Sequence, residues 1–180
     1  LQGVAFLEAL LQEFKVHYDV REEDLKKIPK EGPFITISNH PLGGLDGILL
    51  LRLLLEQRPD YKVMANFLLA RIAPLDPYII QVNPFEDHKD ASSSLMGFKQ
   101  ALAHLKEGKP LGIFPAGEVS TQPSGNIYVD KTWDKSAMKL IKKANVPIIP
   151  IYFHAKNSPL FYQLAKQSDL LRTAKLPSEL

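Results

Sequence analysis

Cysteine is absent from the 180 residues of the chain. This absence excludes disulfide bonds, cysteine-ligated zinc, iron–sulfur clusters and thiol nucleophiles, and it is compatible with a reducing compartment. The chain also has no large excess of either charge, because 22 Lys and Arg residues oppose 20 Asp and Glu residues, for a net charge of +2. Nucleic-acid-binding domains typically carry a strong basic excess, so we predict no nucleic-acid partner.

Long hydrophobic runs are missing as well. The most apolar stretch, residues 48–55, is interrupted by Arg52 and falls well short of the ~18 apolar residues of a membrane span. It is typical of a buried core helix. A chain of this length buries roughly 70% of its unfolded surface, so we predict one domain over residues 1–180 with a core at about 14–156. Because the chain begins at Leu1 without a leader pattern, we expect it to be a piece of a longer protein.

Hydrophobic periodicity predicts strands that alternate with helices. Helices are expected at 1–14, 21–27, 48–55, 92–106 and 135–144, with a loose helical tail over 157–180. Strands are expected at 14–20, 34–38, 62–66, 78–82, 111–114 and 147–153. The apolar strand cores predict an α/β fold with a mixed, mostly parallel central sheet covered by helices on both faces. Prolines in the last strand predict that it lies at an edge or a bulge.

The charge is unevenly distributed along the chain. Residues 1–125 hold 13 basic and 16 acidic residues, a net charge of −3, and residues 126–180 hold 9 basic and 4 acidic residues, a net charge of +5. Such a basic end is suited to an anionic surface or substrate, and solvated lysines on helix faces produce it equally well.

Two turns that follow predicted strands carry polar groups where ligands of α/β sheets collect. The first runs from Asn39 and His40 through Gly43 and Gly44 to Asp46. A Gly-Gly turn can fold the carboxylate back onto one ring nitrogen and leave the other nitrogen to take a proton, as a general base requires. The alternative is structural, with Asp46 capping the helix that follows.

The second turn follows the predicted strand at 111–114, and its glycine lets backbone amides approach a ligand closely. Its candidate substrate-binding residues are Phe114, Pro115, Gly117, Glu118 and Ser120. Downstream, Lys131 and Lys135 are candidates for holding a carboxylate, a phosphate or a thioester donor, and both also fit plain surface cations. Glu118 fits a salt-bridged structural carboxylate as well as a ligand contact.

Together and in this order, the blocks resemble the lysophospholipid (glycerolipid) acyltransferase family, the family of 1-acylglycerol-3-phosphate acyltransferases. Asn39-His40 with Asp46 is similar to the catalytic Asn-His-x4-Asp block. Residues 114–120 are similar to the Phe-Pro-Glu-Gly-Thr-Arg-Ser block, and residues 146–150 to the closing Val-Pro-Ile-Val-Pro block. The resemblance covers about residues 32–153 and implies a glycerol-3-phosphate acyltransferase-like fold.

Two departures separate the chain from the family pattern. One extra residue lies between His40 and Asp46, and Ala116 stands where the second block has Glu, with no Arg following. These versions of the blocks resemble a hemolysin-like subgroup that includes ornithine-lipid O-acyltransferases. Acceptors of that kind carry a hydroxyl on an acyl chain and an amino-acid head, so a phosphate-binding Arg is not required.

The resemblance implies transfer of an acyl chain from an acyl carrier protein or coenzyme A thioester to a lysolipid hydroxyl. His40 is then the base and Asp46 its partner, with no metal and no permanently bound cofactor. We expect a cytoplasmic protein that contacts the inner face of the membrane peripherally. Two alternatives stay open: a non-catalytic lipid- or membrane-binding module, and a metal-assisted hydrolase that uses His40, Asp46 and Glu118 as ligands.

Overall fold

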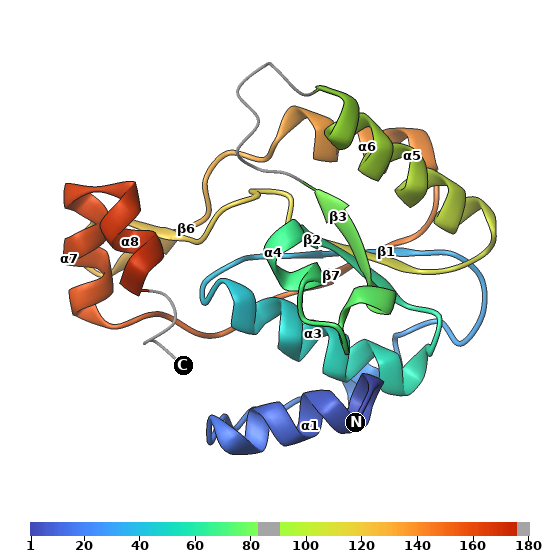
Figure 1. The fold of residues 1–180 in the computed structure, drawn as a ribbon, viewed down its shortest axis with the longest axis horizontal. Coiled ribbons are helices and arrows are strands. Elements are labelled where there is room, and N and C mark those ends of the chain that lie inside the picture. Colours follow the sequence, from blue (N-terminus) through green and yellow to red (C-terminus); the bar gives the residue numbers. More distant parts are fainter. Residues whose placement is uncertain (83–90, 176–180) are drawn as a thin grey trace.

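Five strands form the central sheet of the computed structural model, which describes residues 1–82 and 91–175 (Figure 1). Their order across the sheet is β3-β2-β4-β1-β7, and every neighbouring pair is parallel, which confirms the predicted α/β class. The strands are β1 (Ile35–Ser38), β2 (Lys62–Asn66), β3 (Ile79–Val82), β4 (Leu111–Ile113) and β7 (Ile148–Ile151). β7, which contains Pro150, lies at an edge as predicted, where a missing N–H is tolerated.

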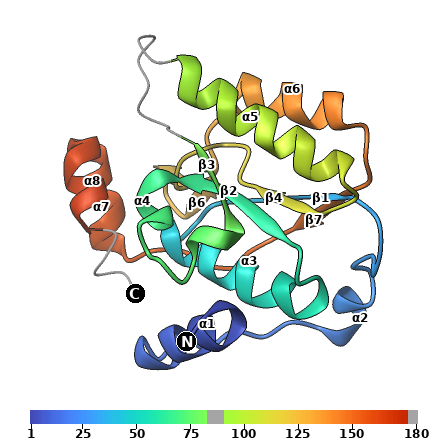
Figure 2. The same ribbon diagram turned by 45° about the vertical axis from the view of Figure 1, so that its right-hand side comes forward.

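Helices cover both faces of this sheet. α1 and α3 lie on one face and α5 and α6 on the other, and Figures 1 and 2 show the two layers. The helices are α1 (Gly3–Glu13), α2 (Glu22–Leu25), α3 (Gly44–Gln57), α4 (Phe67–Ala70), the 3-10 helix η1 (Asp76–Tyr78), α5 (Ala91–Lys106), α6 (Lys135–Ala144), α7 (Pro159–Gln167) and α8 (Asp169–Lys175). In the described ranges, no helix is both long enough and apolar enough to cross a membrane.

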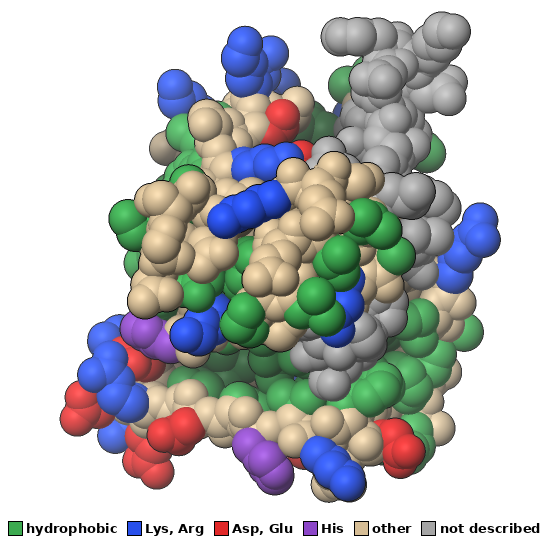
Figure 3. All heavy atoms as spheres, turned by 90° about the vertical axis from the view of Figure 1, so that its left-hand side faces the viewer, with side chains coloured by type: hydrophobic (Ala, Val, Ile, Leu, Met, Phe, Trp, Pro, Cys, Tyr) green, Lys and Arg blue, Asp and Glu red, His purple; other side chains and the backbone are tan. Residues whose placement is uncertain are grey.

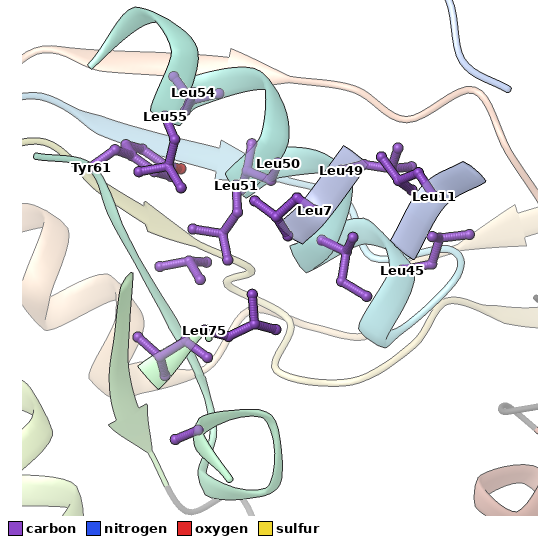
Figure 4. Close-up of a cluster of buried hydrophobic side chains, with 14 of the residues drawn as sticks. Leu7, Leu11, Leu45, Leu49, Leu50, Leu51, Leu54, Leu55, Tyr61 and Leu75 are labelled. Carbon is purple, nitrogen blue, oxygen red and sulfur yellow. The ribbon is translucent and has the colours of Figure 1, made fainter. Parts of the chain in front are cut away.

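The apolar run at residues 48–55, which contains Arg52, forms the middle of α3. This confirms the buried helix predicted for these residues. Side chains of α3 pack with Leu7 and Leu11 of α1 and with Tyr61 in the larger hydrophobic cluster (Figure 4). Arg52 fits this helix because its guanidinium leaves the core and pairs with Glu8 at 2.6 Å and with Glu56 at 2.9 Å. The pairing therefore ties α1 to α3.

One predicted strand is wrong. Residues 14–20 alternate in hydrophobicity, yet α1 ends at Glu13, and none of the described strands includes or pairs with this segment. In a half-buried strand the side chains of Phe14 and Tyr18 would face the core, but both are exposed. Alternation alone does not make a strand, because a strand needs a free sheet edge to bond with.

The described part of the predicted C-terminal tail, residues 157–175, is packed rather than loose, contrary to our expectation, and the rest of the tail lies outside the described residues. α7 begins after Ser158, whose hydroxyl accepts the Phe161 N–H, and it buries Phe161 and Tyr162 almost completely. These two rings pack under a hairpin that the sequence pattern did not predict, formed by β5 (Thr121–Ser124) and β6 (Ile127–Val129). The short strands and a proline in β5 hide this hairpin from a periodicity analysis.

Gly112 of β4 lies directly against the side chain of Tyr61. A Cβ added there lies 2.0 Å from the Tyr61 hydroxyl, which hydrogen-bonds Thr36 Oγ1 at 2.6 Å. We expect Gly112→Ala to lower the free energy of unfolding by about 1–3 kcal/mol, because the buried ring must move. Urea denaturation tests this against Gly47→Ala in α3, where an added Cβ meets nothing within 4 Å and the expected change is a gain of up to about 1 kcal/mol. Equal stability of Gly112→Ala and the wild type contradicts the prediction.

Candidate active site

His40 and Asp46 meet at the carboxyl end of β1. His40 Nδ1 lies 3.0 Å from Asp46 Oδ2, and the side chain of Asp46 is fully buried while that of His40 is 18% exposed. The five intervening residues close into a turn that the Gly43 backbone allows, since its φ of 73° is in the region that favours glycine. The extra residue relative to the family pattern is therefore accommodated within the turn.

Asp46 does not cap α3 in the way predicted. The N-cap residue is Gly43, and Asp46 stands three residues further on, inside the first turn of the helix. Its Oδ2 accepts the backbone N–H groups of Leu42 at 2.8 Å and Gly43 at 3.0 Å, in addition to facing the imidazole. One carboxylate oxygen thus holds both the turn and the ring of His40.

The environment of Asp46 is strongly desolvated. Burial raises the pKa of Asp46, and this effect outweighs the hydrogen bonds from His40, Leu42 and Gly43, which lower the pKa. Its second oxygen, Oδ1, is buried and has no hydrogen-bond partner among the described residues. A carboxylate so placed gains much from a positive charge on the neighbouring imidazole, because little water competes for it.

The other face of His40 packs on aromatic rings from neighbouring strand ends. The centroid of the His40 ring lies 4.3 Å from that of Phe114, which is 6.4 Å from that of Phe153. Asn39 links the same elements, because its side-chain amide donates to the Phe153 carbonyl at 3.0 Å and accepts the Phe153 N–H at 2.7 Å. Asn39 therefore holds the residues after β7 beside β1, and Phe114 limits the rotation of the imidazole.

The second turn lies beside the first. The Ser120 N–H donates to the His40 carbonyl at 2.8 Å, and the Ser120 hydroxyl donates to Asp130, whose Oδ1 also accepts the His40 N–H at 3.3 Å. Gly117 closes the turn by donating to the Phe114 carbonyl at 2.9 Å with a φ of 68°. An added Cβ on Gly117 meets nothing within 4 Å, so the backbone is open to an approaching ligand there.

Glu118 is held between two cations. Its Oε2 lies 2.5 Å from Lys131 Nζ and 2.9 Å from Arg172 Nη2 of α8. Partial burial acts to raise the pKa of Glu118, but the hydrogen bonds and charges of Lys131 and Arg172 prevail and lower the pKa. The expected salt-bridged carboxylate is therefore present, and Lys131 belongs to this cluster.

Three predicted residues lie at the margin of the site. Pro115 is buried, and its carbonyl accepts the Asp134 N–H at 2.8 Å, which fastens the segment before α6 to the second turn. Lys135 begins α6 and is exposed, and Gly44 begins α3 and is exposed. The structure thus gathers the predicted residues at one end of the sheet, with these three at the edge of the site.

The arrangement does not assemble the ligand set of the metal-hydrolase alternative. Glu118 bonds to Lys131 and Arg172 instead of joining His40 and Asp46. Among residues 1–82 and 91–175, no group of three His, Cys, Asp or Glu side chains is close enough to share a metal ion. This alternative therefore gains no support from the described geometry.

A groove of about 410 Å³ borders the first turn at the carboxyl ends of β1 and β7. Apolar and aromatic side chains dominate its lining, with Ser38, Asn39 and Asp130 as polar contributors. The groove is lined by Ile37, Ser38, Asn39, Asp130, Trp133, Pro150, Ile151 and Tyr152. Figure 3 shows a hollow bordered by hydrophobic side chains on the face where α7 and α8 lie. Apolar ligands thus have places to bind at the end of the sheet that carries His40.

A larger cavity, of about 790 Å³, lies elsewhere, between the β3 edge and α5. It is lined by charged and polar side chains such as Lys62, Glu107 and His104 and by apolar ones such as Ile80, Val82 and Met96. Burial lowers the pKa of His104, and its Nε2 faces the Pro110 carbonyl at 3.0 Å, which indicates a structural histidine. We place the functional site at His40 because that end of the sheet combines a histidine–carboxylate pair with apolar surface.

Four residues that contact the two turns from other parts of the chain were not predicted from the sequence: Asp130, Phe153, Asn157 and Arg172. The side-chain amide of Asn157 donates to the Pro41 carbonyl at 2.8 Å. The sequence carries no local signal for Asp130 or Arg172. Asn157 is followed by Ser158 and Pro159, a helix-start pattern that marks the beginning of α7 and carries no information on the contact with Pro41.

Comparison with known proteins identifies the family of the chain. A family model described as Acyltransferase matches residues 1–175. The lyso-glycine lipid O-acyltransferase of Bacteroides thetaiotaomicron is 32% identical over 165 residues, and the protein of the same name from Phocaeicola vulgatus is 30% identical over 164 residues. Each alignment covers 91% of this chain but only 57% and 56% of the respective relative, so the chain spans little more than half of their length. Because the family match runs through both turns and to the end of α8, the chain belongs to the acyltransferase family.

Proposed function

We propose that the protein transfers a fatty acyl chain from a thioester to a hydroxyl of a lysolipid, with His40 as the general base. The observation that carries this proposal is the contact of His40 Nδ1 with the buried Asp46 carboxylate at 3.0 Å. No described residue bonds to Nε2, the nitrogen that would meet the hydroxyl. A histidine oriented by a buried carboxylate is the arrangement that general-base catalysis uses repeatedly.

The chemistry follows from this geometry. His40 Nε2 takes the proton of the acceptor hydroxyl as the hydroxyl oxygen forms a bond to the thioester carbonyl carbon. The resulting imidazolium is stabilised by Asp46, which accepts the hydrogen bond from Nδ1. The carbon–sulfur bond then breaks, and the departing thiolate takes the proton back from Nε2. The products are an ester and a free thiol, and no covalent enzyme intermediate is needed.

The acceptor we propose is a lysolipid with an amino-acid head. Two similar proteins bear the name lyso-glycine lipid O-acyltransferase, and the second block of this chain lacks the Arg that the family pattern places there. A lysophospholipid is the competing acceptor within the same reaction. The head group separates the two, because a phosphate and an amino-acid carboxylate differ in charge and geometry.

The proposed donor is an acyl carrier protein or coenzyme A thioester. An apolar groove that includes Trp133 and Tyr152 lies beside Asn39 and offers a place for one acyl chain within reach of the His40 turn. The net charge of +5 over residues 126–180 favours the approach of an acidic carrier or a nucleotide phosphate.

We also propose that the protein works peripherally at the cytoplasmic face of a membrane. The β6 hairpin strand and the segment after it expose Ile127, Val129 and Trp133 on alternate residues, with Lys131 between them. Tyr128 faces inward in the same run and packs on Tyr162. An exposed stripe of apolar, aromatic and basic side chains is suited to the interface of an anionic bilayer, where a lysolipid resides.

A defined transfer assay tests the proposal. The protein is incubated with acyl carrier protein or coenzyme A thioesters and with lyso-glycine lipid, lysophosphatidic acid or buffer alone, and esters are identified by mass spectrometry. We expect an ester of lyso-glycine lipid, formed at the same rate after treatment with a chelator. Ester formed only with lysophosphatidic acid overturns the proposed acceptor, thioester hydrolysis without an acceptor favours a thioesterase, and loss of activity on chelation favours a metal mechanism.

A further inference from the structure

We propose that Asp130 binds the pantetheine arm of the thioester donor, the part that an acyl carrier protein and coenzyme A share. Its carboxylate would accept the N–H of the amide that lies nearest to the sulfur. The inference rests on the acyl transfer proposed above and deepens it by assigning a side chain to the recognition of the donor. Its basis is the place of Asp130 in the groove, the hydrogen bonds that fix its carboxylate and the charge that it brings there.

Asp130 lies in the groove and beside His40 at the same time. It lines the groove of about 410 Å³ at the carboxyl ends of β1 and β7, together with Asn39. Its Oδ1 accepts the backbone N–H of His40 at 3.3 Å and the hydroxyl hydrogen of Ser120. One carboxylate is therefore both part of the groove wall and a fastening of the His40 turn, so a group that binds to it is held next to that turn.

One oxygen of this carboxylate is left for a ligand. Both hydrogen bonds to the Asp130 side chain end on Oδ1, and no described residue bonds to Oδ2. The neighbouring cation, Lys131, pairs with Glu118 at 2.5 Å instead of with Asp130. A carboxylate that is fixed through one oxygen presents the other as an oriented acceptor, and a hydrogen bond to a charged acceptor is stronger than one between neutral groups.

The charge of the groove distinguishes between the possible ligands. Among the described residues that line it, Asp130 carries the only charge at neutral pH. A single negative charge attracts an N–H donor and repels an anion. Both acceptor heads considered above, an amino-acid carboxylate and a phosphate, are anionic. The arm next to the thioester sulfur is neutral and carries an amide N–H, so the groove fits the arm of the donor better than the head of the acceptor.

The rest of the groove suits the arm as well. Trp133 and Tyr152 contribute aromatic surface to it, and Ile37, Pro150 and Ile151 contribute aliphatic surface. The methylene groups on either side of the sulfur can pack on such surface, while the amide needs a polar partner because an unpaired buried N–H is costly. Asp130 supplies that partner.

The experiment measures binding without turnover, with thioethers that contain no bond for the protein to break. S-decyl-N-acetylcysteamine carries the amide of the arm, and 2-(decylthio)ethyl acetate has an ester oxygen in place of the N–H. Trp133 is the sole tryptophan of the chain and lines the groove, so its fluorescence reports binding. We expect the wild type to bind the amide about tenfold or more tightly than the ester, because a hydrogen bond to a charged group is lost.

Asp130→Asn is the decisive variant. Its amide oxygen can still accept the N–H of His40 and the hydroxyl of Ser120, whereas an NH₂ group replaces Oδ2. The preference for the amide probe should therefore fall to about one while the fold is retained. Asp134→Asn is the matched control, because Asp134 follows Trp133 directly but caps α6 and is not among the residues that line the groove. Its preference should equal that of the wild type.

A third probe tests the charge on the wild type alone, so the test stands even if Asp130→Asn does not fold. S-decylcysteamine places an ammonium where the other probe has its N–H, and it should bind at least as tightly as the amide. The S-decyl thioethers of coenzyme A and of acyl carrier protein then separate the two sources of the arm by calorimetry. Binding of either one, weakened in Asp130→Asn, supports the inference and names the donor.

Three outcomes overturn the inference: a wild type that binds the amide and the ester equally, a folded Asp130→Asn that weakens both probes by the same factor, as a purely structural carboxylate would, or binding of neither thioether of the natural carriers. Failure of the transfer assay with an intact preference for the amide would instead count against the proposed acyl transfer alone, because these probes carry no acyl group on sulfur.

Discussion

Replacing His40 with Ala is expected to reduce acyl transfer by about 10²- to 10⁴-fold in a protein that remains folded. The reason is that His40 is the base, and no described side chain occupies a position to replace it. Initial rates with a saturating thioester and lysolipid measure the effect. The loss should appear in kcat, because the proton is transferred during the reaction rather than on binding.

Two further substitutions make the His40 result interpretable. His40→Asn keeps a side-chain N–H that can donate to Asp46 but cannot take a proton at neutral pH, so it should be as inactive as His40→Ala with better retained stability. His17→Ala is the matched control, because His17 is an exposed histidine between α1 and α2. A folded His40→Asn protein with wild-type turnover would remove His40 from the mechanism.

Asp46→Asn is expected to reduce kcat by a similar factor, about 10²- to 10⁴-fold. The amide lacks the negative charge that stabilises the imidazolium, and it can also reverse the hydrogen bond to Nδ1. Substrate binding should change little, because the carboxylate is fully buried behind His40. Steady-state kinetics at several lysolipid concentrations separate the expected fall in kcat from a rise in KM.

Asp134→Asn provides the control for the loss of a capping carboxylate. Asp134 is the N-cap residue of α6, and its Oδ1 accepts the N–H groups of Ser136 at 2.7 Å and Ala137 at 3.2 Å, as Asp46 accepts those of Leu42 and Gly43. Asn caps helices about as well as Asp, so activity should be unchanged. Equal losses in Asp134→Asn and Asp46→Asn would mean that Asp46 acts only by holding its turn.

The parts of the site that lie close together in the sequence were predictable. His40, Gly43 and Asp46 fall within one strand-to-helix turn, where the short distance along the chain restricts how the groups can meet. The parallel sheet was predictable for a similar reason, because apolar strands alternating with helices have few ways to bury both faces. The sequence pattern did not reveal that Asp46 lies in the first turn of α3 rather than at its N-cap, because this depends on where α3 begins.

The parts that depend on packing between distant segments were not predictable. Arg172 meets Glu118 only because α7 buries Phe161 and Tyr162 against the β5–β6 hairpin, and neither the hairpin nor this packing has a local signature. The strand wrongly predicted at 14–20 shows the converse. Its alternation is a real local signal, but none of the strands described in the structure pairs with it.

Chemical rescue is the most direct test of the claim that His40 acts as a proton acceptor. Truncation to Ala leaves space between Phe114 and Asp46 for a free imidazole, so the rate of ester formation by His40→Ala is measured as imidazole is added. We expect a rate near zero without imidazole that rises with its concentration. A folded His40→Ala protein that forms ester at the wild-type rate without imidazole would contradict the role of His40 as proton acceptor.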